Sequence, residues 1–167
     1  MKIEKNILKF YIDFDNTIIT IRSIELKDIE NLRIWKNSNK KYFFHNSDIS
    51  KEQQIAWFNN FTTIENDYMF VVEKEDISFG CMGVRLFDNK WDAYNIILGK
   101  SEFGGHGYMS KCFNTILLFA YNMHNLPITL KVLKQNPAVK WYLNIGFEII
   151  SSEKSFYNMV LKLDLTK

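Results

Sequence analysis

The feature that most constrains this chain is its one cluster of glycines, which lies between a strand-like run and a long helical run. The segment Ser101-Glu-Phe-Gly-Gly-His-Gly107 follows apolar residues that end at Leu98, and it precedes a helical pattern that reaches Met123. A helix N-terminus presents unpaired N–H groups and a partial positive charge, and glycine lets a ligand approach the backbone closely. The pattern therefore predicts either a phosphate cradle or a ligand-free turn between strand and helix.

The cluster fits neither of two common phosphate-binding motifs. Its glycines do not follow the Gly-x-Gly-x-x-Gly spacing of dinucleotide-binding folds, and no Gly-Lys-Ser/Thr follows, as a P-loop requires. The sequence of the loop is therefore compatible both with a ligand site and with a bare turn.

The first half of the chain alternates strand and helix patterns. Two runs rich in Ile, Phe and Tyr, 7–13 and 17–23, flank Asp13-Phe-Asp-Asn16 and predict a hairpin. A short amphipathic helix is expected over 28–37, with Ile29, Leu32, Ile34 and Trp35 on its apolar face, and a second over 50–61, with Ile55, Trp57, Phe58 and Phe61. Ser50 and Gln53 have the spacing of a capping box at the start of that second helix.

The second half predicts a meander followed by a strand–helix alternation. Strands are expected over 68–73, 77–87 and 91–98, with turns at Asp76 and at Asp88-Asn89. A helix over 107–123 follows, then a strand over 128–133, a helix capped by Asn136-Pro137 and ended at Gly146, and strands over 147–151 and 157–163. This order predicts one mixed α/β domain around a single sheet.

Composition excludes several classes of protein. The formal net charge is only +2 and no basic stripe is present, which disfavours nucleic acid as a partner. Two cysteines and three histidines show no metal-ligand spacing, so no metal is expected. No stretch is long and apolar enough for a signal peptide or a membrane span, so we expect a cytoplasmic protein with no membrane partner.

The glycine loop and the segments after it resemble the GNAT acetyltransferases. The resemblance rests on Glu102-x-x-Gly105-x-Gly107-Tyr108, the long helix, the run Val132 to Asn136-Pro, and Trp141-Tyr142-Leu-Asn-Ile-Gly146-Phe147. It covers about residues 91–150. The family has Gln or Arg where this chain has Glu102, and a carboxylate beside a pyrophosphate is electrostatically unfavourable.

The N-terminal half is similar to two branches of the same superfamily. Arg22, Asp28, Leu32, Trp35-Lys-Asn37, Phe44, Ile49-Ser50, Gln53 and Trp57-Phe58 carry that likeness. One branch acetylates amino groups on nucleotide-activated sugars, as in pseudaminic acid synthesis, and the other acetylates the amino termini of ribosomal proteins.

The resemblance implies a fold and a co-substrate. The fold is a central mixed, mostly antiparallel sheet of about seven strands with about four helices. One domain, 1–167, would place acceptor-side helices in 1–66, an acetyl-CoA-binding core in 67–150 and a terminal strand in 151–167. Acetyl-CoA would be bound by Ile97, Leu98, Phe103, Gly104, Gly105, His106, Gly107, Tyr108 and Asn136. Asn136 is equally well explained as a plain helix cap.

The same resemblance makes Tyr142 the candidate catalytic residue. A phenol within hydrogen-bond reach can protonate the thiolate that leaves when an amine attacks the thioester. The alternative for Tyr142 is a plain core position. The general base stays open among Asp88, Asp92, Glu102, His45 and His106.

The resemblance also implies a small-molecule amine as acceptor, held near Trp35, Asn37, Phe44 and His45. Arg33, Lys36, Lys40 and Lys41 follow one another without an acid, which favours an anionic acceptor such as a nucleotide sugar, unless they form a solvated helix face. A protein N-terminal acetyltransferase and a non-catalytic acyl-CoA-binding module are the alternatives. The assembly is expected to be a monomer or a homodimer.

Overall fold

The computed structural model describes residues 5–162, which fold around one eight-stranded sheet. The strand order is β1-β2-β3-β4-β5-β6-β8-β7, and every neighbouring pair is antiparallel except β5 and β6. The elements follow in the order β1 (Lys9–Phe14), β2 (Thr17–Ser23), α1 (Ile29–Ser38), α2 (Lys51–Phe61), β3 (Asp67–Lys74), β4 (Ile77–Phe87), β5 (Lys90–Leu98), α3 (Tyr108–Met123), β6 (Ile128–Leu133), α4 (Ala138–Ile145), β7 (Phe147–Ser152) and β8 (Phe156–Leu161).

The expected mixed α/β fold is confirmed, with eight strands in the described chain rather than about seven. The expected last strand, 157–163, ends at residue 163, which lies outside the described residues. Within residues 5–162 no helix is both long and apolar enough to cross a membrane.

Three hairpins with two-residue turns lie in the antiparallel part of the sheet. Their two-residue turns are Asp15-Asn16, Glu75-Asp76 and Asp88-Asn89, and all six residues have positive φ between 50° and 61°. Asn and Asp tolerate this left-handed conformation, and a turn of this hand matches the twist of the flanking strands. The polar turn residues of the sequence therefore fix the register of β1–β2, β3–β4 and β4–β5.

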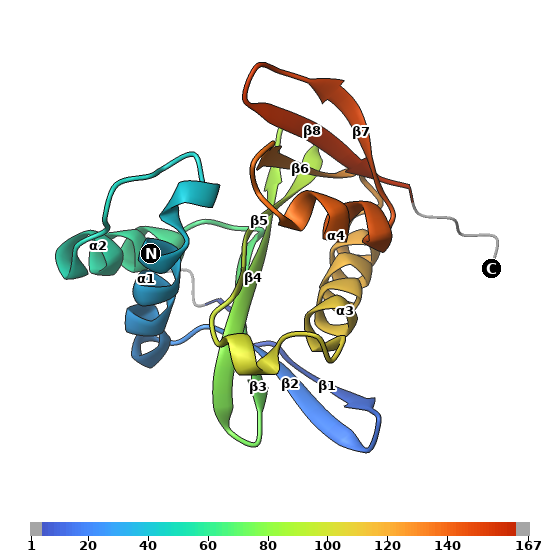
Figure 1. Ribbon diagram of the computed structural model, residues 1–167. Helices are drawn as coiled ribbons and strands as arrows, with labels where there is room; N and C mark the ends of the chain where they lie inside the picture. Colours follow the sequence, from blue (N-terminus) through green and yellow to red (C-terminus); the bar gives the residue numbers. More distant parts are fainter. Residues whose placement is uncertain (1–4, 163–167) are drawn as a thin grey trace.

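The helices cover both faces of the sheet, with α1 and α2 on one side and α3 and α4 on the other (Figure 1). Successive residues of β3 divide between the two layers: Phe70 and Val72 pack toward α3, whereas Met69 and Val71 pack toward α1 and α2. This is the period-two alternation of a strand that is buried on both faces.

The predicted helix faces are correct only in part. Leu32 and Trp35 of α1 are buried, but Ile34 is 45% exposed; in α2, Phe61 and the polar Gln54 are buried, whereas Ile55 is 46% exposed. The capping box forms as expected, since the Ser50 hydroxyl accepts from the Gln53 N–H and the Gln53 side chain accepts from the Ser50 N–H.

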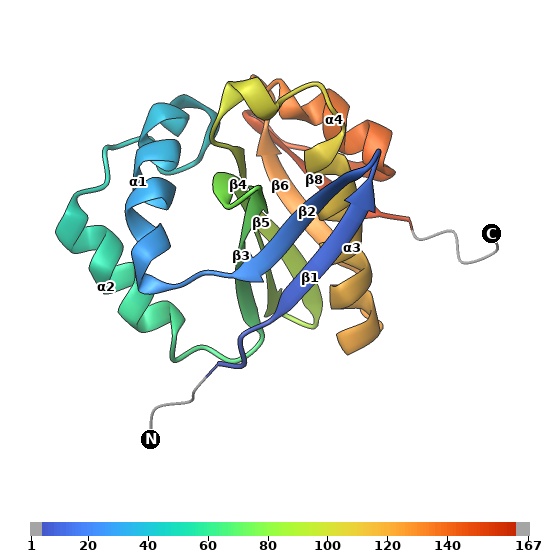
Figure 2. The same ribbon diagram turned by 90° about the horizontal axis from the view of Figure 1, so that it is seen from below.

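The parallel pair β5–β6 is where the sheet opens. These strands pair only at Trp91–Ile128 and Asp92–Thr129, and beyond those two positions they diverge. Helix α3 lies between them in the chain and packs on the side of the sheet opposite α1 (Figure 2). Ligands of open α/β sheets bind in the crevice at the carboxyl ends of such strands, so the divergence marks a candidate site.

Candidate active site

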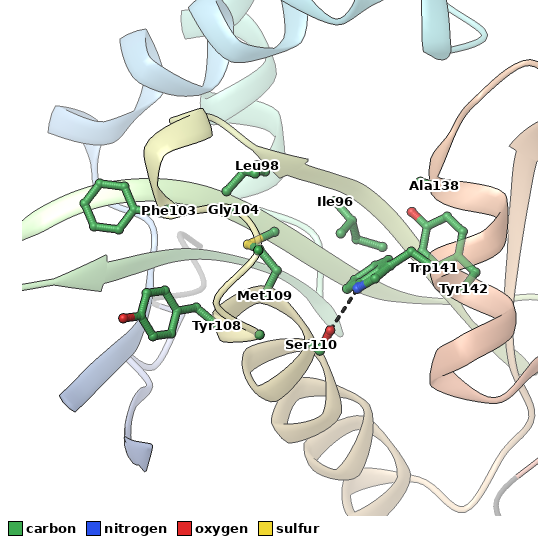
Figure 3. Close-up of a pocket in the computed structure, with 12 residues that line it drawn as sticks. Ile96, Leu98, Phe103, Gly104, Tyr108, Met109, Ser110, Ala138, Trp141 and Tyr142 are labelled. Carbon is green, nitrogen blue, oxygen red and sulfur yellow. Dashed lines mark hydrogen bonds between the residues drawn. The ribbon is translucent and has the colours of Figure 1, made fainter. Parts of the chain in front are cut away.

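The glycine loop leads from the end of β5 into α3 and borders a cavity of about 390 Å³. We name it the glycine-loop cavity; its walls come from the last residues of β5, the loop, the first turn of α3 and one side of α4 (Figure 3). Gly105 and Gly107 have φ of 78° and 80°, a conformation that favours glycine. A Cβ at Gly105 would meet no atom within 4 Å, so the loop is open to a ligand there.

The first turn of α3 offers unpaired amides. The first hydrogen bond that enters the helix runs from the Lys111 N–H to the Gly107 carbonyl, at 3.1 Å. The N–H groups of Tyr108, Met109 and Ser110 therefore precede the helical ladder, and the positive end of the helix dipole adds to their attraction for an anion. This geometry suits a phosphate, which is one of the two outcomes that the sequence left open for the loop.

Two aromatic contacts fix the shape of the loop. Phe103, on a short 3-10 turn over Ser101–Phe103, stacks on Phe79 with ring centroids 4.8 Å apart. His106 stacks on Tyr108 at 5.2 Å and is exposed outside the cavity. Glu102 is also exposed and does not line the cavity, so the residue that departs from the family pattern places no carboxylate on the cavity wall.

A free strand edge forms another wall of the cavity. The Gly99 N–H donates to the Phe79 carbonyl, so by alternation the backbone of Ile97 faces β4 and the backbones of Ile96 and Leu98 face the gap toward β6. Leu98 lies where it was expected, whereas Ile97 is 4% exposed and packs beneath α1. Ile96, which the sequence reasoning missed, takes the place that was assigned to Ile97.

Ile97 was misplaced because β5 carries an extra residue. Pairing runs from Cys81–Ile97 to Gly83–Tyr94, two steps along β4 but three along β5, and Asn95 has φ of 49°. Such a bulge exchanges the faces of the residues beyond it. No alternation of apolar and polar residues in the run Tyr-Asn-Ile-Ile-Leu signals this exchange.

Tyr142 of α4 stands at the inner end of the glycine-loop cavity (Figure 3). Its ring packs against Phe113 and Phe147, with centroids 6.2 and 6.0 Å away, and the residue is only 6% exposed. No hydrogen bond to another described residue uses its hydroxyl. Burial raises the pKa of Tyr142 well above that of a free phenol, so the hydroxyl keeps its proton at neutral pH.

A second cavity, of about 330 Å³, lies on the other side of Tyr142. We name it the cationic cavity because Lys36, Arg85 and Lys131 line it and Asp92 is the one carboxylate on its wall. Asp92 accepts from the Arg85 Nε at 2.9 Å, so one positive charge of the wall is already paired. Ile96 and Tyr142 line both cavities, which makes them the junction between the two spaces.

The expected acceptor residues divide into two pairs. Phe44 and His45 line the cationic cavity, but Trp35 and Asn37 do not. Trp35 is 5% exposed and belongs to the core under α1, and both ends of the Asn37 amide bond the backbone of Ile49 at 3.0 and 2.8 Å. Trp35 therefore belongs to the core and Asn37 supports the loop before α2, and neither forms the cavity wall.

The source of positive charge also differs from the expectation. Arg33 pairs with Glu30 and Lys40 with Asp48, so of the basic run only Lys36 reaches the cavity. Arg85 and Lys131 complete the charge from β4 and β6, and nothing in their local sequence marks them as neighbours of Lys36.

Asn136 lies at the edge of the cationic cavity rather than in the glycine-loop cavity. Its Oδ1 accepts from the Ala138 N–H at 2.9 Å, as a helix cap does, and its Nδ2 donates to the Tyr42 carbonyl at 3.4 Å. The cap role of Asn136 is confirmed. Within the described residues, no three His, Cys, Asp or Glu side chains gather as metal ligands.

The model of the acetyltransferase (GNAT) domain family matches residues 19–148, which include every wall of the glycine-loop cavity. The chain belongs to the GNAT acetyltransferases. The expected family and enzyme class are thus confirmed. Among curated proteins none matches the sequence.

Solved structures agree with this GNAT fold. A domain from Methanocaldococcus jannaschii superposes with a TM-score of 0.76 at 17% identity, over 87% of this chain and 98% of that one. Spermidine N-acetyltransferase from Vibrio cholerae, in complex with CoA and spermine, gives 0.73 at 22% identity, over 86% and 94%. A putative acetyltransferase from Salmonella typhimurium with acetyl-CoA gives 0.69 at 16%, over 88% and 95%.

Proposed function

We propose that this GNAT enzyme transfers the acetyl group of acetyl-CoA directly to a primary amine, and that the transfer takes place at the junction marked by Ile96 and Tyr142. The junction carries the proposal, because a thioester in one cavity and an amine in the other would meet only there. The glycine-loop cavity fits the donor: the amides of the first α3 turn suit a pyrophosphate, and Gly105 leaves room beside them.

The free edge of β5 suits the arm of the donor. The pantetheine part of CoA carries two amides, and the exposed backbone groups of Ile96 and Leu98 offer them a strand-like partner. An N–H near Ile96 would also polarise the thioester carbonyl and stabilise the oxyanion that forms during attack. The thioester then lies beside the Tyr142 hydroxyl.

Tyr142 is the proposed general acid. A neutral amine attacks the thioester carbon, the tetrahedral intermediate breaks its C–S bond, and the phenol donates its proton to the departing sulfur. The ring is held by Phe113 and Phe147 while its hydroxyl makes no hydrogen bond to another described side chain, which leaves the proton available for the sulfur.

We propose that the acceptor is an amine on an anionic small molecule, most specifically an amino sugar activated by a nucleotide. The support is the charge of the cationic cavity, where Lys131 takes part in no ion pair among the described residues. A polycation such as a polyamine would be repelled by this wall.

The size of the acceptor side fits the same proposal. The cationic cavity shares Arg85, Asp92, Leu130 and Lys131 with an outer cavity of about 780 Å³. Lys90 and the 68%-exposed Phe87 border that outer space. An acceptor with a phosphate and a flat ring beyond its amine would find a cation and an aromatic face there.

A panel of amines tests the proposal. Thiol release from acetyl-CoA would be measured with nucleotide amino sugars, peptides with free N-termini, spermidine and aminoglycosides, and we expect the nucleotide amino sugars to give the highest kcat/KM. A higher value with peptides would favour the ribosomal-protein type, and one with spermidine would overturn the anionic acceptor. Raised thermal stability with acetyl-CoA but no release with any amine would indicate a binding module instead.

The two thiols fit a cytoplasmic location, which we also propose. Cys81 and Cys112 are free and buried, and burial raises the pKa of each to about 12, so both are protected from oxidation. Size-exclusion chromatography with light scattering would decide between the proposed monomer and homodimer.

A further inference from the structure

Lys36 is placed differently from the other lysines of the acceptor side. It extends from α1 into the cationic cavity, where its Nζ donates to the Asn95 side-chain oxygen and lies 3.6 Å from the centroid of the Phe43 ring. Its side chain is half-buried, and no carboxylate pairs with it among the ion pairs of residues 5–162. An unpaired lysine in such a setting has its ammonium partly removed from water.

The bulge brings this amine next to the junction. Asn95, which holds Nζ, is the left-handed residue of the β5 bulge, and the next residue is Ile96, which lines both cavities. Tyr142 lines the same cationic cavity from α4. Lys36 and Tyr142 thus approach the junction from different layers of the protein.

Direct transfer needs a group that accepts a proton. An aliphatic amine reaches the enzyme as its ammonium ion, and it has to lose one proton before nitrogen can attack the carbonyl. The carboxylates considered from sequence are poorly placed: Asp92 is paired with Arg85, Glu102 is outside the glycine-loop cavity, and Asp88 lies in the distant β4–β5 turn. His45 lines the cavity wall but is exposed, and His106 lies outside.

We propose that the Nζ of Lys36, in its neutral form, is the general base that takes this proton from the acceptor. The inference rests on the proposed acetyl transfer and adds the missing acid–base partner of Tyr142. Its placement beside the bulge, facing the cavity that receives the amine, is the observation that carries it.

The surroundings of Lys36 favour the neutral amine. Burial lowers the pKa of Lys36 to about 8, and the charge of Arg85 acts in the same direction, whereas the Cys81 thiol opposes it. The other charged or titratable groups on the cavity wall are Asp92, His45, Lys131 and the phenols of Tyr42, Tyr94 and Tyr142. A base with a pKa near the working pH combines a useful neutral fraction with adequate proton affinity.

The proton balance closes with these two side chains. Lys36 removes one proton from the acceptor ammonium, and the freed lone pair forms the C–N bond. As the C–S bond breaks, Tyr142 protonates the sulfur, and the second proton lost by the acceptor nitrogen restores the phenol. Lys36 then releases its proton to water, so amide, CoA thiol and one proton are the products.

The test is the pH dependence of kcat/KM in two variants, K36R and K36M, with the best amine of the panel. Wild type is expected to show an ascending limb near pH 8. K36R keeps a cation but cannot lose its proton, so we expect about a 100-fold loss of kcat at pH 8. K36M should lose as much kcat at pH 8. The ascending limb of its pH profile should move to the pKa of the acceptor ammonium.

Three further variants sharpen the interpretation. K131M removes a cation from the same cavity and should raise KM with little change in kcat; K40M, in the Lys40–Asp48 surface pair, should leave both unchanged. K36C alkylated with bromoethylamine regains an ammonium more acidic than that of lysine. The alkylated variant should recover activity, and the ascending limb of its pH profile should lie at lower pH than in wild type. Cys81 and Cys112 are buried and are therefore shielded from the reagent.

The outcomes separate two failures. If wild type transfers acetyl groups and K36R keeps kcat and the wild-type limb, Lys36 is an anion-binding residue, and only this inference is wrong. The same holds if H45Q, rather than K36M, removes the ascending limb near pH 8 from the pH profile of kcat/KM. If wild type binds acetyl-CoA but acetylates nothing in the panel, the proposed function fails and the inference fails with it.

Discussion

At the scale of single residues, Tyr142 combines a fixed ring with an uncommitted hydroxyl. Tyr142→Phe removes only that oxygen, so the packing against Phe113 and Phe147 stays. We expect kcat to fall by about 100-fold, as for the loss of a general acid. Affinity for acetyl-CoA, measured by calorimetry, should stay within a factor of two of wild type. An unchanged kcat would remove Tyr142 from the chemistry.

Gly105 and Gly146 allow backbone strain to be separated from ligand contact. Both have positive φ, of 78° and 121°, but only Gly105 borders the glycine-loop cavity. Either change to alanine should cost about 1 kcal/mol or more of stability, because L-residues disfavour this conformation. Gly105→Ala should also weaken acetyl-CoA binding at least tenfold, since its methyl group projects into space that is open in the wild type.

Gly146→Ala is the matched control for Gly105→Ala. Its Cβ would lie 3.5 Å from a methyl of Leu161, an ordinary contact remote from the loop. Equal loss of acetyl-CoA affinity in both variants would mean that global destabilisation, and not the cradle, explains the effect.

Residues of the candidate site can be predicted from sequence where they belong to a short local motif. The glycine loop and the Asn136 cap are readable because turn geometry and capping act within a few residues. Arg85 and Ile96 could not be found in this way, and no local signal separates Lys36 from the other basic residues of its run. Their meeting depends on a bulge and on three separate elements, and no short window of sequence contains that information.

At the scale of elements, α1 is locked to the end of β5 by one close approach. The Trp35 ring lies against Gly99, where an added Cβ would come within 2.2 Å of it. Gly99→Ala should therefore push α1 outward and lower the free energy of unfolding by about 1–3 kcal/mol. Urea denaturation would measure this loss. Because α1 carries Lys36, KM for the amine should rise more than KM for acetyl-CoA.

A second substitution tests whether the clash is the cause. Trp35→Leu alone removes packing from the α1 core, but in the Gly99→Ala background it also makes room for the new methyl group. The double variant should be more stable than the sum of the two single effects predicts. Strict additivity would contradict the proposed lock.

The secondary structure was largely predictable from the sequence, and the errors in the predicted helix faces have a common origin. Hairpin turns, the capping box and the Gly146 stop were readable from local chemistry. The faces of α1 and α2 were less so, since Ile34 and Ile55 lie in solvent while Gln54 is buried. Two helices that also pack on each other bury more than one stripe, so a single apolar face is an incomplete description of either.

At the scale of the whole molecule, Lys36 links the site to the pH dependence of stability. Its pKa is about 8 in the folded protein and near 10.5 in an unfolded chain, so above pH 8 the folded state holds fewer protons. Stability from this group is therefore lowest below pH 8 and rises as the pH increases toward 10.5. Cys81 and Cys112 act oppositely, because burial raises their pKa to about 12.

Comparison of wild type with K36M isolates the lysine, since both proteins keep the two thiols. At pH 7 K36M should be at least as stable as wild type, because burying the ammonium costs free energy that methionine does not. Between pH 7 and pH 10, the difference in the free energy of unfolding, measured by urea denaturation, should shift in favour of wild type. A difference that is constant with pH would place the Lys36 ammonium in water.

The two cavities share Ile96 and Tyr142, and this has a consequence for the order of events during turnover. Because the two spaces adjoin at these residues, an amine can attack the thioester directly, and the acetyl group has no need to rest on an enzyme nucleophile. Initial velocities should accordingly give intersecting rather than parallel double-reciprocal lines, and enzyme incubated with labelled acetyl-CoA alone should retain no label after denaturation.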